Sequence, residues 1–207
     1  MRGRYGPAQA GQNQEKYGIP RFAKTGVKQY PLIDCHKGTS AVEKMMSSDA
    51  TRKKFISDAV AKMKEQKFQG YNLDIELGAP AADGKLYAQF VDEFGTALHA
   101  AGGKLSSDIG GCPSSYMGMT CEEYANTTID NVMSMSTYTH DPASFQSQIK
   151  KNEAALGGKY SVGIDTGFPA AKLSSALSSA FTGSAVAIWV NSPSPAFMAA
   201  IGEWLHA

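Results

Sequence analysis

The chain has 207 residues, 43% of them hydrophobic and 19% charged, a balance typical of one globular domain with a substantial core. Twenty basic and nineteen acidic side chains leave a formal net charge of +1, which argues against nucleic acid or an anionic membrane surface as a partner. The sequence has no run of about 18 apolar residues, and its first residues have no apolar signal core, so we expect neither a membrane span nor a signal peptide.

Residues 1–26 are rich in Gly, Gln, Lys and Arg and lack periodicity, which predicts an irregular N-terminal arm. From Val27 onward, short β-like segments alternate with amphipathic segments, so residues 27–207 are expected to form a single domain. The predicted strands are 27–33, 71–77, 104–109, 131–138, 160–165 and 185–190. Strand, loop and helix repeated six times predict a parallel sheet with right-handed crossovers.

Apolar residues recur at helical spacing between these strands. In the first two helices they are Phe55, Ile56, Ala59, Val60, Met63, Leu86, Phe90, Val91, Phe94 and Leu98. Asp49 is expected to cap the first helix, and the basic cluster 52–54 is expected to lie on its surface. Thr120 and Glu123 have the spacing of a capping box for a short later helix.

The three cysteines are too few for a disulfide scaffold and lack the spacing of a metal site. Cys112 and Cys121 are close enough to pair, but free thiols are an open alternative because the compartment is unknown. The glycine-rich turns lack the spacing of a phosphate loop. We therefore expect neither a metal nor a cofactor.

In the strand 71–77, "YNLDIEL", apolar and polar residues alternate strictly, and Asn72, Asp74 and Glu76 share one face. Strands of a doubly wound sheet are covered on both faces and should be almost continuously apolar. In a parallel barrel, one strand face packs on helices while the other lines a lumen that opens to ligands at the carboxyl ends. We therefore favour an α/β fold of the (β/α) TIM-barrel type over a doubly wound sheet.

Asp74 and Glu76 have two interpretations. An alternating strand commonly exposes its polar face to solvent at the edge of a sheet. Alternatively, residues two apart on a strand are separated by about 6.6 Å, so both carboxylates can share one pocket and influence each other's ionisation. The second interpretation predicts an acid–base site.

Several segments resemble glycoside hydrolase family 18, which includes chitinases, chitobiases and lectin-like relatives. "QGYNLDIE" resembles its D-G-x-D-x-D-x-E signature on the fourth barrel strand, and the similarity extends over residues 27–205. The segments similar to its third, sixth, seventh and eighth strands are "VKQYPLID", "MSTY", "YSVGIDTGFP" and "AVAIWV". The resemblance implies retaining hydrolysis of β-1,4-linked N-acetylglucosamine oligomers, with the substrate's own acetamido oxygen as nucleophile. It also implies a secreted or lysosomal location.

The resemblance assigns roles to matching residues. Glu76 corresponds to the general acid, Asp74 to the residue that orients and charge-stabilises the acetamido group, and Tyr138 to its hydrogen-bond partner. Trp189 corresponds to the apolar floor of a sugar subsite. Asn72 corresponds to the second aspartate of the signature and is also expected to contact substrate.

Other polar residues lie at predicted strand ends, where barrel enzymes gather their catalytic groups. Asp165 is expected near the substrate, although a hydrogen-bonding role is open for it as for Asp108. Met135 is expected to fill the pocket. His36 and His140 either line the mouth or are ordinary loop residues.

The sequence also departs from the family. Gln69 and Asn72 replace the first two aspartates of the signature, which leaves Asp74 and Glu76. Asn72 with Ile75 resembles the chitobiase branch. These changes keep open a second function, that of a non-catalytic chitinase-like protein that binds carbohydrate or serves in assembly.

Only 26 residues precede the segment similar to the third strand, which is too few for two β/α units. The barrel is therefore expected to be incomplete, with about six units. Three explanations are open: the chain is a fragment, the open edges are covered by self-association or a partner chain, or the arm fills the gap.

Overall fold

The computed structural model describes residues 28–35, 40–76, 84–113, 119–189 and 193–207. The predicted arm, residues 1–26, lies outside this part of the chain. None of the described helices is both long and apolar enough to cross a membrane.

One sheet contains six parallel strands in the order in which they occur in the chain. They are β1 (Leu32–Asp34), β2 (Gly70–Asp74), β3 (Lys104–Ile109), β4 (Asn131–Ser134), β5 (Tyr160–Asp165) and β6 (Val186–Trp189). The order of a doubly wound sheet reverses at a switch point, whereas this one does not, so the barrel-type α/β fold is confirmed. Within the described residues the sheet is not closed, since β1 and β6 do not pair with each other, and this agrees with the expected incomplete barrel of about six units.

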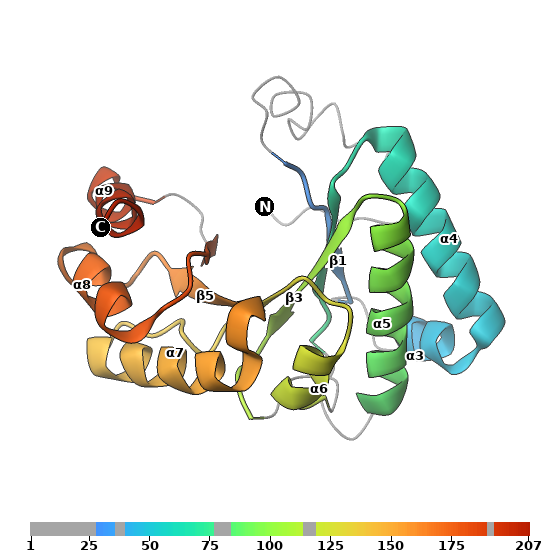
Figure 1. Ribbon diagram of the computed structural model, residues 1–207, viewed down its shortest axis with the longest axis horizontal. Coiled ribbons are helices and arrows are strands. Elements are labelled where there is room, and N and C mark those ends of the chain that lie inside the picture. The colour runs from blue at the N-terminus through green and yellow to red at the C-terminus, as the bar shows by residue number, and fades with distance from the viewer. Residues whose placement is uncertain (1–27, 36–39, 77–83, 114–118, 190–192) are drawn as a thin grey trace.

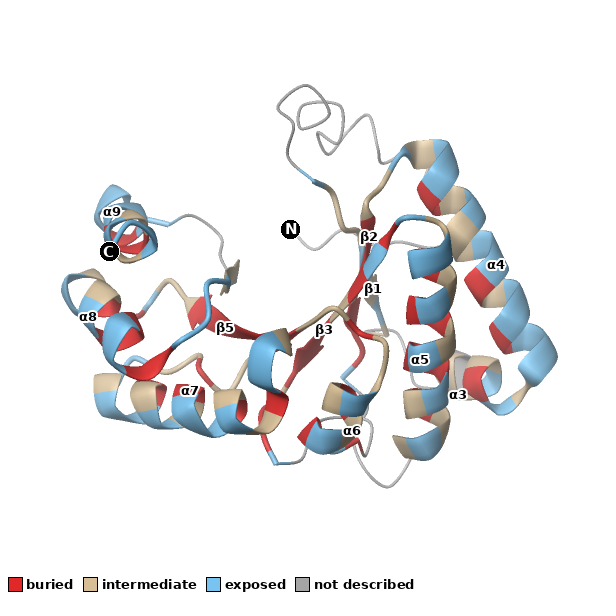
Figure 2. Ribbon diagram, in the orientation of Figure 1, coloured by how far each residue is buried: buried red, intermediate tan, exposed pale blue. Residues whose placement is uncertain are grey.

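Helices follow the strands and lie along the outer side of the curved sheet (Figure 1). They are α3 (Ser40–Ser47), α4 (Asp49–Gln66), α5 (Gly84–Ala100), α6 (Cys121–Asn126), α7 (Pro142–Leu156), the 3-10 helix η2 (Gly157–Lys159), α8 (Ala170–Ala180) and α9 (Pro195–Leu205). The buried residues concentrate on the sheet and on the helix faces turned towards it (Figure 2). Leu73, Leu105, Val132 and Val162 are fully buried there. The outer strand face therefore carries the core, as the alternation of residues 71–77 predicts.

Strand β4 is shorter than predicted. It ends at Ser134, whereas the sequence predicts a strand over 131–138. The buried Thr137 hydroxyl shares its one hydrogen between the carbonyl oxygens of Ser134, at 2.9 Å, and Gly163, at 2.6 Å, and so fixes a turn after the strand. Tyr138 consequently leaves the strand direction at the carboxyl end of the sheet.

The N-terminal caps of two helices can be compared with the predictions, and one of them is corrected. Ser48, not Asp49, caps α4, because the Ser48 hydroxyl accepts from the Thr51 amide. The capping box predicted for α6 is confirmed, with the Thr120 hydroxyl accepting from the Glu123 amide and the Glu123 carboxylate accepting from the Thr120 amide. The residue that follows this cap, Cys121, forms a disulfide with Cys112.

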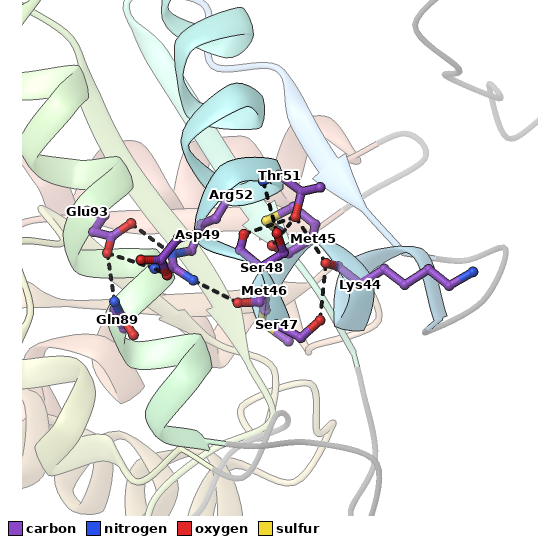
Figure 3. Close-up of polar contacts among 10 residues, drawn as sticks. All are labelled: Lys44, Met45, Met46, Ser47, Ser48, Asp49, Thr51, Arg52, Gln89 and Glu93. Atoms are coloured by element: carbon purple, nitrogen blue, oxygen red, sulfur yellow. Dashed lines mark hydrogen bonds and ion pairs between the residues drawn. The ribbon is translucent and has the colours of Figure 1, made fainter.

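The prediction that the basic cluster 52–54 lies on the helix surface is wrong for its first residue. Arg52 is 1% exposed. Its Nε and Nη2 atoms donate to the Glu93 carboxylate at 2.8 and 3.1 Å. Nη2 also donates to Asp49 at 2.6 Å, and Nη1 donates to the Met46 carbonyl oxygen at 2.8 Å (Figure 3). A guanidinium can be buried when its donors are satisfied in this way, and here it joins α3, α4 and α5.

Replacing Arg52 by Met is expected to lower the free energy of unfolding by about 2–3 kcal/mol, because charge-assisted hydrogen bonds are lost and the Met46 carbonyl loses its donor. Urea unfolding measures this change. The matched control is Lys53→Met on the exposed face of α4, which should stay within about 0.5 kcal/mol of the wild type. Equal midpoints for the two variants would contradict the structural role of Arg52.

Candidate active site

Strand β2 carries the acidic residues into the interior of the curved sheet. Tyr71, Leu73 and Ile75 are buried on the helix side, so the residues between them face the opposite, inner side. Asp74 is 2% exposed, whereas Glu76 is exposed just beyond the strand. Because β2 has a paired neighbour on each side, the edge-strand interpretation does not apply to Asp74.

The signature glycine has a steric role at the start of β2. Gly70 has φ +148°, and a Cβ atom at this position would lie 1.9 Å from the Lys104 carbonyl oxygen of β3. Only glycine permits this approach of the two strands. The close pairing sets Asn72 opposite Ser106 and Leu73 opposite Ser107 further along.

A hydrogen-bonded chain crosses from β3 to β2 and back on the inner face. Ser106 Oγ donates to Asn72 Oδ1 at 2.6 Å, and Asn72 Nδ2 donates to Asp108 Oδ2 at 2.9 Å. Asp108 is 4% exposed. Burial, followed by the charges of Asp74 and Glu76, raises the pKa of Asp108 to about 7, against the opposing effect of the Asn72 hydrogen bond. Asp108 therefore holds a proton below neutral pH.

Tyr138 faces the same carboxylates from the turn after β4. Its hydroxyl oxygen is buried and has no hydrogen-bond partner among the described residues. Burial raises the pKa of Tyr138 above its usual value of 10, and the charges of nearby acidic residues, Asp108 first and then Asp74, add to this. A Cβ at Gly163 of β5 would lie 2.9 Å from Tyr138 Cε1, so this glycine leaves room for the ring. The Tyr138 hydroxyl is thus a protonated donor available to a ligand.

Asp165 ends β5 at the same carboxyl edge. Its Oδ1 atom accepts from the Gly167 amide at 2.7 Å and lies 3.2 Å from His140 Nε2. The turn after β5 therefore depends on Asp165, and the charge of Asp165 also acts on Tyr138. His140 is exposed beside it.

The structure places two further predicted residues at this edge. Met135 directly follows β4, is half-buried, and its carbonyl oxygen accepts from the Tyr138 amide at 3.0 Å. Trp189 ends β6 in register with Asp165, and its side chain lies outside the described part of the structure. His36 also lies outside it.

Gln69 lies apart from the cluster of carboxylate side chains and bonds to Gln29 and Lys67. It precedes β2 at the opposite end from Glu76, where its Oε1 accepts from the Gln29 amide at 2.7 Å and its Nε2 donates to the Lys67 carbonyl oxygen at 2.6 Å. In place of the first aspartate of the family signature, this chain thus has a glutamine that holds the segment before β1 by a hydrogen bond to Gln29.

Asp108 has a larger part in the site than the hydrogen-bonding role expected for it from the sequence. Its signal lies in "KLSSDI", where Ser106 and Asp108 alternate with Leu105, Ser107 and Ile109 just as the acidic residues of β2 alternate with apolar ones. Among the described residues, no group of His, Cys, Asp and Glu has an arrangement that could hold a metal ion. The site combines two buried carboxyls, Asp74 and Asp108, with the exposed Glu76 and the phenol of Tyr138. Such groups are suited to proton transfer and to stabilisation of a positive charge.

Comparisons with known proteins identify the family and the fold. Glycosyl hydrolases family 18 matches residues 12–186. No curated protein matches the chain. A class V chitinase from Pseudomonas fluorescens superposes with TM-score 0.80 at 16% identity, over 95% of this chain and 87% of that one. A chitinase from Chromobacterium violaceum superposes with TM-score 0.75 at 14% identity, over 100% and 87%.

The spore cortex-lytic enzyme of Bacillus megaterium superposes with TM-score 0.62 at 15% identity, over 72% of this chain and 38% of that one. At such identities these likenesses show the fold. The family match covers most of the chain and includes the acidic strand with Asp74 and Glu76. The chain therefore belongs to the glycosyl hydrolases of family 18.

Proposed function

We propose that this chain is a chitinase-type glycosidase that cleaves β-1,4-linked N-acetylglucosamine oligomers with retention of configuration. The observation that carries the proposal is the grouping of an exposed Glu76, a buried Asp74 two residues earlier, and a buried Tyr138 hydroxyl without a partner among the described residues. Carboxylates and a phenol placed together at the carboxyl end of a parallel sheet match the site that barrel enzymes use.

Each step of the proposed reaction uses one of these groups. Glu76 protonates the glycosidic oxygen while the acetamido oxygen of the substrate attacks the anomeric carbon, so the C–O bond to the leaving sugar breaks as a cyclic cationic intermediate forms. Glu76, now a carboxylate, then removes a proton from the water that opens this ring. Two inversions at the anomeric carbon give net retention.

The buried groups stabilise the ring that forms from the acetamido group. Asp74 supplies negative charge beside the developing cation, and its burial strengthens that interaction. Tyr138 donates a hydrogen bond to the acetamido oxygen, a role suited to a phenol whose raised pKa keeps its proton in place.

The remaining predicted residues form the proposed binding surface. Trp189 serves as the apolar floor of a sugar subsite, and Met135 and Asp165 border it. Both polar atoms of the Asn72 side chain already bond Ser106 and Asp108, so we assign Asn72 to holding the site rather than to direct sugar contact.

A pair of fluorogenic substrates tests the proposal. The chitobioside of 4-methylumbelliferone should be hydrolysed, and the cellobioside should react at least about 100-fold more slowly, because it lacks the acetamido nucleophile and the rate advantage of its intramolecular attack. The aglycone is identical in both, so the difference comes from the acetamido groups of the sugars and not from the leaving group. Equal hydrolysis of the two substrates would contradict the acetamide-assisted route.

The second candidate function is carbohydrate binding without turnover. The observation in its favour is the open sheet, whose described strands are fewer than a closed barrel of this type requires. Calorimetric binding of chitohexaose by a protein that hydrolyses neither fluorogenic substrate would select this function.

A further inference from the structure

We propose that Asp108 is a positioning residue of this site and supplies, from β3, the buried carboxyl that the acidic motif lacks at Asn72. This inference rests on the proposed function, because the site that Asp108 serves is the one built from Asp74 and Glu76. The role is indirect, since Asp108 acts through these two neighbours and not by contact with the reacting atoms.

The side chain of Asn72 has a fixed orientation. Ser106 donates its hydroxyl hydrogen to Asn72 Oδ1, so the other end of the carboxamide, Nδ2, points to Asp108 Oδ2. An asparagine in this environment therefore acts as a donor to a carboxyl on the next strand. An aspartate in its place would have offered a carboxylate on β2, and here that carboxylate stands on β3.

The register of β2 and β3 brings Asp108 beside Asp74. Leu73 pairs with Ser107, so the residues that follow them, Asp74 and Asp108, are neighbours on adjacent strands, which are about 4.8 Å apart in a sheet. Both belong to the inner face by alternation. The charges of Asp74 and Glu76 accordingly act on Asp108.

The second carboxyl oxygen of Asp108 differs from the one that accepts from Asn72. Oδ1 is buried and has no hydrogen-bond partner among the described residues, although buried polar atoms are normally paired. A proton on this carboxyl reduces the cost of burying it. Asp108 thus brings to the site both a third carboxyl and a proton that it retains up to neutral pH.

The charged and titratable groups that face Asp108 are Asp74 from β2, Glu76 just after β2, and Tyr138 from the turn after β4. Neighbouring charges make the protonation of each group depend on the others, and replacing Asp108 removes the carboxyl that keeps its proton to about pH 7. Asp108 therefore extends the pH range over which a proton is available for catalysis.

Asp108→Asn tests this role, because a carboxamide oxygen can still accept from Asn72 while the titrating group is gone. The alkaline limb of kcat/KM for the chitobioside is expected to move to lower pH by about one unit or more. The double variant Asn72→Asp with Asp108→Asn returns a carboxyl to β2 and should move the limb back towards the wild-type position. Asp58→Asn, which removes an exposed carboxylate on α4, should leave the limb unchanged.

A readout independent of turnover uses carboxyl ¹³C NMR. The wild type should show one aspartate titrating near pH 7, and this signal should be absent from Asp108→Asn. The folded state holds this proton to a higher pH than the unfolded chain does, so the stability of the wild type decreases as the pH rises from about 4 to about 7. Over this rise in pH, Tm should therefore fall more steeply in the wild type than in Asp108→Asn.

The outcomes separate the two proposals. Hydrolysis by the wild type with the same alkaline limb in Asp108→Asn would overturn the role of Asp108 and leave the glycosidase function standing. An inactive wild type would overturn the function, and the NMR titration would then decide whether Asp108 holds the proton. Absence of an aspartate that titrates near neutral pH, or a double variant that behaves like Asp108→Asn, would also overturn the inference.

Discussion

Replacing Glu76 by Gln is expected to lower kcat for the chitobioside by about 10²- to 10⁴-fold, the usual contribution of a general acid–base group. Gln preserves the shape of Glu but carries no proton for the leaving oxygen and cannot activate water afterwards. KM should change little, because the side chain is exposed at the mouth and the sugar contacts lie elsewhere. Steady-state kinetics with the fluorogenic substrate measure both constants.

The acidity of the leaving group sharpens this test. A dinitrophenolate leaves without protonation, so the loss in Glu76→Gln should be smaller for a dinitrophenyl chitobioside than for the methylumbelliferyl compound. The matched control is Glu203→Gln on the exposed side of α9, which should retain wild-type kinetics. If Glu76→Gln and Glu203→Gln have the same kcat, Glu76 is not the acid.

The part of this site that the sequence predicts comes from one periodic strand. The alternation in "YNLDIEL" predicts both the buried outer face with Leu73 and the inner face with Asp74, and the structure has both. The sequential parallel order follows from the same reasoning, because regularly spaced strands and helices restrict the topology to a few arrangements. The local sequence pattern is enough to predict a feature that recurs at regular spacing along one strand or helix.

Contacts between elements were not predicted. Nothing near Arg52 in the sequence indicates that Glu93, 41 residues later, completes its set of partners. In the same way, Asn72 and Asp108 are 36 residues apart and meet only because of the register of β2 and β3. Single-residue interpretation therefore placed Arg52 on the surface and gave Asp108 a generic strand-end role. Such pairs are set by packing and register, which periodicity does not reveal.

Replacing Asp74 by Asn is expected to lower kcat/KM for the chitobioside by about 10²- to 10³-fold, as for removal of one preorganised group that stabilises transition-state charge. Asn fits the same space, and it removes a buried charge, so the fold should tolerate it. The charge of Asp74 also contributes to the raised pKa of Asp108, so Asp108 should titrate below about 7 in this variant. Asp58→Asn is again the matched surface control, with wild-type kinetics expected.

The response of each variant to the leaving group distinguishes Asp74 from Glu76. Protonation matters only to the departing oxygen, so a dinitrophenyl leaving group compensates for the loss of Glu76. Attack by the acetamido oxygen creates the cationic ring whichever group leaves, so the loss in Asp74→Asn should persist with the dinitrophenyl substrate. A stable thiazoline analogue of the ring should also bind Asp74→Asn more weakly than the wild type, by a larger factor than chitobiose does, because only the analogue resembles the charged intermediate. Recovery of Asp74→Asn with the dinitrophenyl substrate, or equal weakening of both ligands, would assign Asp74 to ground-state binding and not to stabilisation of the cation.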